Sequence, residues 1–248
     1  MVDYKGYEFI QFERQERILT ATLNRPECLN AVNAKLHAEL VEMYADFARD
    51  EEADVMILTG AGRGFCAGGD IRGGLLGGDF EETKERVFRE ARALIVNILE
   101  VDKPILAAVN GAAAGLGVTL ALFCDVVYAS ERARLGDTHV KIGLVAGDGG
   151  AVIWPLLVGV NRAKELLMTG DMLDAGEAYR LGLVNHVVPD DKLMEAVRDR
   201  AKQLASGSTL AIRGTKKAVN AYLKWMVNQV LDLSMLLEKE CFDRMLRK

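Results

Sequence analysis

Short apolar runs alternate with amphipathic helical patterns along the first half of the chain, and this alternation is the strongest constraint on the fold. Runs that are continuously apolar or alternate apolar with polar residues predict strands at 17–23, 55–58, 105–109, 125–129 and 133–135. Apolar residues at three- and four-residue steps predict helices at 31–49, at 81–99 and in the second half of 112–123. Strands that alternate with helices are typical of an α/β protein.

Two glycine-rich segments interrupt this pattern. Residues 60–78 hold nine glycines, so we predict a loop there. Residues 110–117 follow a predicted strand and precede an apolar helix, and free backbone N–H groups in that position suit an anion or a developing oxyanion. The GxGxxG pattern of a dinucleotide site is not satisfied, so we expect no nicotinamide cofactor.

The pattern changes after Gly149. Residues 189–248 hold long amphipathic patterns and no convincing strand, so we expect a core of residues 1–188 followed by a helical C-terminal region, 189–248. The last segment, 223–246, is apolar nearly all round in places. A helix of that kind needs a partner surface in its own core or in a neighbouring subunit, and we expect this region to support oligomers.

Composition and charge exclude several classes of function. The 248 residues include 31 Lys and Arg against 36 Asp and Glu, and this net charge of −5 argues against nucleic acid as a partner. No apolar stretch reaches the roughly 20 residues of a membrane-spanning helix, and the polar N-terminus lacks the pattern of a signal peptide. The four cysteines form no CxxC pair, so we expect a reduced, cytoplasmic protein. The three histidines match no metal-ligand spacing, so we expect no metal site.

Four segments, taken together and in order, resemble the crotonase, or enoyl-CoA hydratase/isomerase, superfamily. They are Asn24-Arg25-Pro26 with Leu29-Asn30-Ala31, then 65–71, then 110–117 with Cys124-Asp125, and finally 142–150. The resemblance implies a superhelix of repeated ββα turns, with a helical C-terminal region that supports a homo-trimer or homo-hexamer. It also implies an acyl-CoA thioester as the substrate, without a further cofactor.

Positions that match the family's motifs are expected to form the site. The resemblance implies that the backbone N–H groups of Gly69 and Leu116 hold the thioester oxygen, and two fixed donors would stabilise the negative charge of an enolate there. It implies that CoA lies along two segments, with contacts from Arg25, Cys28, Leu29, Ala31, Ala67, Gly68, Asp70, Ile71 and Arg72.

Hydratases of this family resemble one another in two glutamates. At the corresponding positions this sequence has Thr119 and His139. Asp137 and Asp148 also remain near the expected reaction centre. We expect His139 to act as the acid or base, because imidazole exchanges protons near neutral pH. Asp148 would be the second group, and the hydroxyl of Thr119 would position water. The structural alternatives are an N-cap role for Asp148, a hydrogen-bonded structural role for His139, and a solvated loop position for Asp137.

The expected function is therefore that of an acyl-CoA enzyme of the hydratase/isomerase class, which stabilises a thioester enolate with nonstandard acid and base groups. Three alternatives stay open. They are isomerisation of an enoyl-CoA double bond, hydrolysis or carbon–carbon cleavage of a β-keto acyl-CoA, and a noncatalytic CoA-binding subunit.

Overall fold

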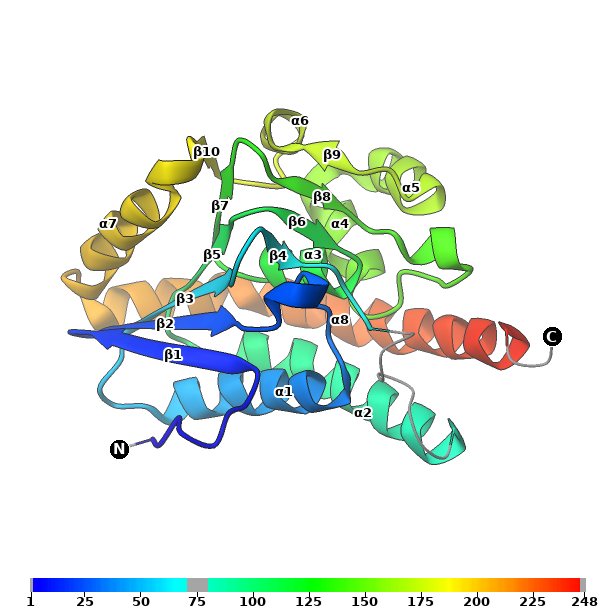
Figure 1. Ribbon diagram of the computed structural model, residues 1–248, viewed down its shortest axis with the longest axis horizontal. Helices are drawn as coiled ribbons and strands as arrows, with labels where there is room; N and C mark the ends of the chain where they lie inside the picture. Colours follow the sequence, from blue (N-terminus) through cyan, green and yellow to red (C-terminus); the bar gives the residue numbers. More distant parts are fainter. Residues whose placement is uncertain (1, 71–79, 246–248) are drawn as a thin grey trace.

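Two β-sheets surrounded by helices make up the fold (Figure 1), in a computed structural model that describes residues 2–70 and 80–245. The first sheet has the order β1-β2-β3-β5-β7-β10, and the second has the order β4-β6-β8-β9. Neighbouring strands run parallel except in the pairs β1–β2 and β8–β9. The strands of the first sheet are β1 Ile10–Gln15, β2 Ile18–Leu23, β3 Val55–Gly60, β5 Ile105–Val109, β7 Val126–Ser130 and β10 His186–Val188. Those of the second are β4 Gly64–Cys66, β6 Ala112–Ala114, β8 Arg134–Gly136 and β9 Leu173–Asp174.

One ββα unit repeats along the chain. In each turn a strand of the first sheet is followed by a strand of the second and then by a helix: β3, β4 and α2, next β5, β6 and α3, and then β7, β8 and α4. The helices of these turns are α2 Phe80–Glu100, α3 Leu116–Leu122 and α4 Gly150–Val158. This is the repeated ββα superhelix that the resemblance implied.

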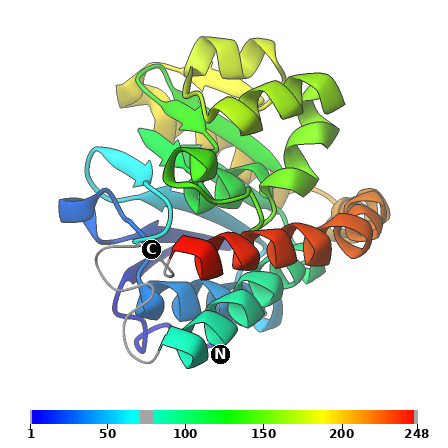
Figure 2. The same ribbon diagram turned by 90° about the vertical axis from the view of Figure 1, so that its right-hand side faces the viewer.

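The first long helix, α1 (Ala34–Arg49), packs beside α2 on one side of the first sheet (Figures 1 and 2). It begins after Asn33, whose side chain accepts a hydrogen bond from the N–H of Leu36 at 2.9 Å. Its fully buried face includes Leu40 and Phe47, which belong to the main apolar core. The remaining helices are α5 Val160–Thr169, α6 Ala175–Arg180, α7 Leu193–Ala205 and α8 Thr209–Met245, with short 3₁₀ turns η1 Pro26–Cys28, η2 His139–Ile142 and η3 Asp190–Lys192.

All five predicted strands are confirmed to within a few residues, but three local predictions are wrong. Residues 60–78 are not wholly a loop, because β4 forms within them and pairs with β6. Residues 112–114 are a strand and not a loop, and α1 begins at Ala34 and not at residue 31. Strands of three small residues carry no periodicity of their own, and only pairing with a distant segment stabilises them.

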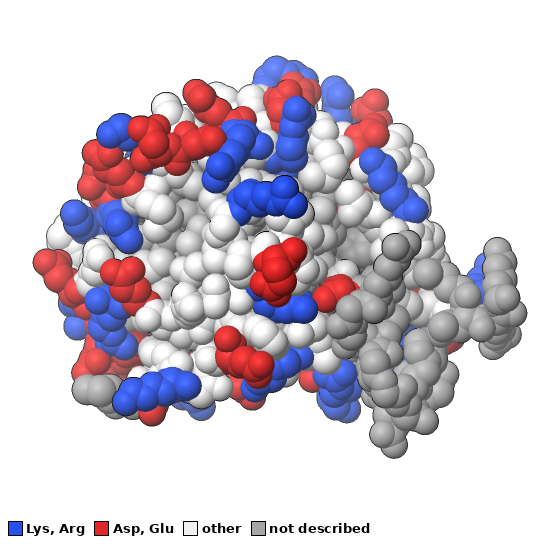
Figure 3. Space-filling view, viewed as in Figure 1, with Lys and Arg blue, Asp and Glu red and all other residues white. Residues whose placement is uncertain are grey.

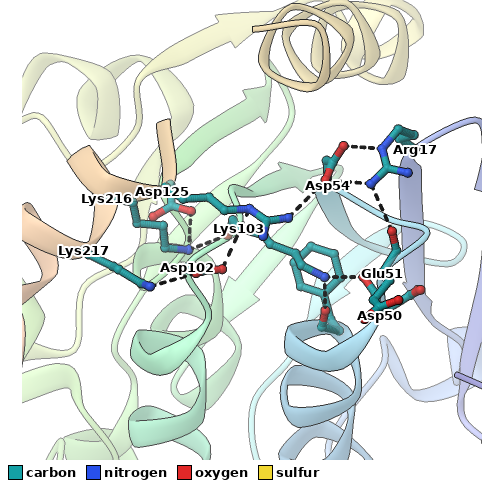
Figure 4. Close-up of polar contacts among 11 residues, drawn as sticks. Arg17, Asp50, Glu51, Asp54, Asp102, Lys103, Asp125, Lys216 and Lys217 are labelled. Carbon is teal, nitrogen blue, oxygen red and sulfur yellow. Dashed lines mark hydrogen bonds and ion pairs between the residues drawn. The ribbon is translucent and has the colours of Figure 1, made fainter. Parts of the chain in front are cut away.

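The helical C-terminal region is held to the core by ion pairs near the start of α8. Lys216 Nζ lies 2.6 Å from Asp125 Oδ2, and Lys217 Nζ lies 3.0 Å from Asp102 Oδ2 (Figure 4). The helix then crosses α2 and packs against α4 (Figure 2). This path brings the last turns of α8 to the cavity described below. The division at residue 188 into a core and an oligomerisation region stays a prediction.

The surface carries charges of both signs. On the face shown in Figure 3, acidic and basic side chains are interspersed around the edge and do not form one basic patch. Within the described residues, no helix has the length and apolar character needed to cross a membrane.

Candidate active site

A cavity of about 560 Å³ lies where the strand ends of the second sheet meet α1, α2 and the last turns of α8. Gly69 lines it from the segment after β4, and Leu116 lines it from the start of α3. The polar side chains of His139, Asp148 and Glu238 also line it. The rest of the lining is mainly apolar, from side chains such as those of Val87, Phe88, Leu144 and Phe242.

The backbone of Gly69 leaves one N–H group free at this cavity. The N–H of Val32 donates to the oxygen of Gly68, and the N–H of Asp70 donates to the oxygen of Val32, both at 2.8 Å. Successive N–H groups of an extended segment point to opposite sides, so the N–H of Gly69 faces away from Val32. Within the described part of the chain, it donates no hydrogen bond.

A second free N–H lies close by, at Leu116. As the first residue of α3, Leu116 has no intrahelical partner for its N–H, and none of the described residues supplies another. The close approach of the two segments requires glycine at position 68. There φ is +91°, and a Cβ atom would lie 2.7 Å from the oxygen of Ala114 and 3.6 Å from the nitrogen of Leu116.

His139 is held between two carboxylates. Its Nδ1 lies 2.7 Å from Asp137 Oδ1, and its Nε2 lies 3.3 Å from Asp148 Oδ2. The other oxygen of Asp148 accepts a hydrogen bond of 3.3 Å from the Thr119 hydroxyl. Burial by itself would lower the pKa of His139, but the attraction of Asp148 and the hydrogen bond with Asp137 outweigh it and raise that pKa well above its usual value. His139 is therefore an imidazolium at neutral pH.

Glu238 brings a third carboxyl group to the same imidazole. It reaches in from α8, and its Oε1 lies 3.9 Å from His139 Nε2. Burial, together with repulsion from Asp148, raises the pKa of Glu238 to about 8, although His139 opposes the rise. Near neutral pH, Glu238 is thus mainly a carboxylic acid beside the side chain of Asp148.

Glycines in the loop before α4 make room for these carboxyl groups. A Cβ atom on Gly147 would collide with Glu238 Oε2, and one on Gly150 would collide with Asp137 Oδ2. The Ser234 hydroxyl donates to the oxygen of Gly147 at 2.9 Å, which ties this loop to α8. The carboxyl groups around His139 therefore need glycine at positions 147 and 150 of the Gly-Asp-Gly-Gly sequence.

Two structural alternatives from the sequence are wrong. Asp137 is not a solvated loop residue, because only 1% of it is exposed and it bonds to His139. Asp148 does not cap α4, because Gly149 is the N-cap residue and no side chain caps that helix. Both aspartates instead face His139, since the short 3₁₀ turn η2 directs the imidazole inward.

The predicted CoA contacts lie at or beside the same cavity. Ala31, Ala67, Gly68 and Asp70 line it. Arg25 lies next to this wall, with its Nη1 3.1 Å from Asp70 Oδ2. Cys28 and Leu29 are half-buried in and just after the turn η1. Ile71 and Arg72 lie outside the described residues.

Asp137, His139 and Asp148 also lie close enough to hold a metal ion, since each offers one ligand atom and these atoms lie within 4.8 Å of one another. The two aspartates, however, engage opposite nitrogens of the ring. A metal ligand must be a neutral imidazole, whereas the raised pKa of His139 favours a proton on each nitrogen. The geometry fits an imidazolium between carboxylates better than a metal centre.

Two polar residues of the cavity were missed in the sequence. Glu238 lies one helical turn from Ser234 and from Phe242, which are both buried, so its position on the buried face of α8 was a detectable signal. His37 lines the cavity from α1, and its Nδ1 lies 2.8 Å from Glu90 Oε2 on α2. Nothing in the sequence pairs these two residues, because they are 53 positions apart.

Comparisons with known proteins agree with the fold. A family model described as "Enoyl-CoA hydratase/isomerase" matches residues 13–248. The 1,2-epoxyphenylacetyl-CoA isomerase of Escherichia coli K12 is 36% identical over 91% of this chain and 87% of its own length. A probable enoyl-CoA hydratase of Rhizobium meliloti is 38% identical over 88% of this chain and 84% of its own length. The crystal structure of an enoyl-CoA hydratase/isomerase from Mycobacterium paratuberculosis superposes with a TM-score of 0.89 at 38% identity, covering 94% of this chain and 93% of that one.

Proposed function

The chain belongs to the enoyl-CoA hydratase/isomerase family of acyl-CoA enzymes, and we propose that it reversibly adds water to the double bond of a 2-enoyl-CoA thioester. In this proposal Asp148 is the base and Glu238 is the acid. One observation carries it: two carboxyl groups, of which Glu238 has its pKa raised to about 8, line one cavity with two backbone N–H groups that donate to none of the described residues. Two titratable groups whose environments move their pKa values apart are suited to opposite roles, one as the acid and the other as the base.

The free N–H groups of Gly69 and Leu116 support the binding of the thioester. When a nucleophile adds to the double bond, negative charge develops on the thioester oxygen. Two preorganised donors beside that oxygen stabilise the enolate without reorganisation. Arg25, Cys28, Leu29, Ala31 and the segment 67–72 then bind the CoA moiety, and the thioester is the substrate without a further cofactor.

The contacts around His139 support this division of roles. An imidazolium is a poor base, whereas the carboxyl group of Asp148 lies 3.3 Å from its Nε2. Asp148 accepts a proton from water as the water oxygen bonds to Cβ of the acyl group. Glu238 then gives its proton to Cα, and the enolate returns to a thioester.

The same contacts reset the cluster after each turnover. Addition leaves Asp148 protonated and Glu238 ionised. His139 Nε2 lies 3.3 Å from Asp148 and 3.9 Å from Glu238, so it can give its proton to Glu238 and take one from Asp148. Asp137, bonded to Nδ1, keeps the ring oriented throughout.

The direct test offers the purified protein crotonyl-CoA, a 3-enoyl-CoA and a β-keto acyl-CoA in water enriched in ¹⁸O. We expect crotonyl-CoA to give a 3-hydroxyacyl-CoA that carries ¹⁸O at Cβ, both with and without a chelator. Hydrolysis of the β-keto compound, or tight CoA binding without turnover of any substrate, would contradict hydration. Loss of activity on chelation would point to a metal at Asp137, His139 and Asp148.

Isomerisation of the double bond is a second candidate, because the family model that matches the chain is described as enoyl-CoA hydratase/isomerase. A single carboxyl group could take a proton from one carbon and return it to another. The same assay separates the two reactions, since the product of isomerising the 3-enoyl-CoA would contain no oxygen from the solvent.

The proton state of Glu238 predicts the pH dependence of turnover. An acid must be protonated to donate, so we expect kcat to be full below pH 8 and to fall as the pH rises through about 8, the pKa of Glu238. Glu238→Gln cannot ionise and should lower kcat by about 10²-fold. It should also abolish this alkaline decline, and an unchanged alkaline decline in a folded variant would exclude Glu238 as the acid.

We further propose that the protein works in the cytoplasm as a homo-trimer or homo-hexamer. All four cysteines are free, as a reduced protein requires. On α8, Tyr222, Trp225, Leu233 and Leu236 each expose more than half of their surface, which suits a helix that packs against another subunit. Light scattering is expected to give three or six times the chain mass of 27.2 kDa, whereas a stable monomer at micromolar concentration would contradict this.

A further inference from the structure

His37 and Glu90 form a polar pair at the cavity that the proposed reaction does not use. His37 is 1% exposed and lines the cavity from α1. Its Nδ1 lies 2.8 Å from Glu90 Oε2, and Glu90 Oε1 lies 3.5 Å from Arg86 Nη1. A carboxylate held between an arginine and an imidazole accepts the N–H of the imidazole, so Nδ1 carries a proton.

The other ring nitrogen of His37 has no partner. Within the part of the chain that the structure describes, Nε2 makes no hydrogen bond to any residue. In a neutral ring whose Nδ1 is protonated, Nε2 is an acceptor. Nε2 is not one of the fully enclosed side-chain atoms that lack a partner, so it is open to the cavity that His37 lines. The cavity is where a partner for Nε2 can enter.

The surroundings of His37 indicate which part of a ligand this partner belongs to. The neighbouring α2 side chains that line the cavity are Val87, Phe88 and Ala91, which are all apolar. His37 is thus one polar position within an apolar wall contributed by α1 and α2. The acid and base come from other elements, the loop before α4 and the helix α8. An apolar wall suits the hydrocarbon part of an acyl group.

We propose that His37 binds a hydroxyl group on the acyl chain, so that the protein prefers hydroxylated acyl-CoA thioesters to unsubstituted ones. The ligand class rests on the proposed function. A hydroxyl satisfies Nε2 whichever proton state the ring has, because it can donate to a neutral imidazole and accept from a charged one. A site built to bond a substrate hydroxyl also rejects the analogue that lacks it, since its own buried polar group is then left unpaired.

Calorimetry with saturated ligands tests this preference without any turnover. The probes are hexanoyl-CoA and octanoyl-CoA with their ω-hydroxy derivatives, and 3-phenylpropanoyl-CoA with its meta- and para-hydroxy derivatives. We expect at least one hydroxylated ligand to bind about tenfold more tightly than its parent. Equal binding within every pair would overturn the proposal. Because these ligands have no double bond, the result stands even if the protein proves not to hydrate enoyl-CoA.

Two variants assign the preference to His37. His37→Leu, and His37→Phe, which keeps a ring of similar size, should each reduce the ratio of affinities to about one while the parent ligand still binds. Lys35→Ala changes the same helix at a residue half-exposed to solvent and should leave the ratio unchanged. A preference that survives in both His37 variants would overturn the proposal. So would an equal weakening of free CoA and of all acyl-CoAs, because His37 would then bind the pantetheine.

Discussion

Replacing Gly69 with proline is expected to lower kcat by about 10²- to 10³-fold, while most of the affinity for CoA remains. Proline removes the backbone N–H that we assign to the thioester oxygen. The hydrogen bonds that hold this segment to Val32 come from Gly68 and Asp70, so the substitution leaves them in place. The interaction strengthens as the oxygen becomes charged, so its loss affects the transition state more than the bound substrate.

Gly69→Ala is the matched control, because alanine keeps the N–H and adds only a methyl group. We expect it to retain much more activity than the proline variant, at similar affinity for acetyl-CoA. Thermal unfolding of both variants would show that the segment is intact. Equal loss of kcat in the two folded variants would contradict the oxyanion assignment, because crowding and not the missing donor would explain it.

Most of the fold follows from local patterns in the sequence. Strands β3 and β5 are fully buried apolar runs, and the buried face of α1 has the three- and four-residue spacing that predicted it. The strands β4 and β6 of the second sheet are different, because they pair with each other across tens of residues. The strand β4 sits in a segment so rich in glycine that its composition alone predicts a loop.

The site was predicted as far as motifs along the chain could define it. His139 and Asp148 were selected by their positions within recognisable segments, and both line the cavity. Burial of Asp137 could not be predicted, because it depends on the space that Gly150, which has no side chain, leaves for the carboxyl group of Asp137. Residues that meet only across helices, such as Glu238 with His139 and His37 with Glu90, carry no joint signal in a single sequence.

Asp148→Asn is expected to lower kcat by about 10²- to 10⁴-fold at every pH, the range typical of a lost acid–base group. The amide is nearly the same size, but it cannot accept a proton from water. Because Gly149 caps α4, the substitution does not remove a helix cap, but it removes the charge that attracts the buried His139 and so lowers the free energy of unfolding. Initial rates with crotonyl-CoA and thermal unfolding would measure the two effects separately.

His139→Ala is expected to lower kcat by roughly 10²-fold or more at neutral pH, with a different pH profile. It removes the cation that lies between Asp137 and Asp148. Because His139 opposes the rise in the pKa of Glu238, its loss moves that pKa further above about 8. This change moves the alkaline decline of the variant to higher pH.

Thr119→Ala should have the smallest effect of the three substitutions, because its hydroxyl takes no part in proton transfer and only bonds to Asp148 and to the oxygen of Gly115, each at 3.3 Å. The sequence alone placed His139 first, as the acid or base itself. Our proposal puts Asp148 first, as the base, and makes His139 the cation beside it. If His139→Ala proves the more damaging substitution and its pH optimum does not move, while Asp148→Asn retains nearly normal kcat, the imidazole itself transfers the proton. A shifted optimum in His139→Ala together with an inactive Asp148→Asn would establish the carboxylate as the base.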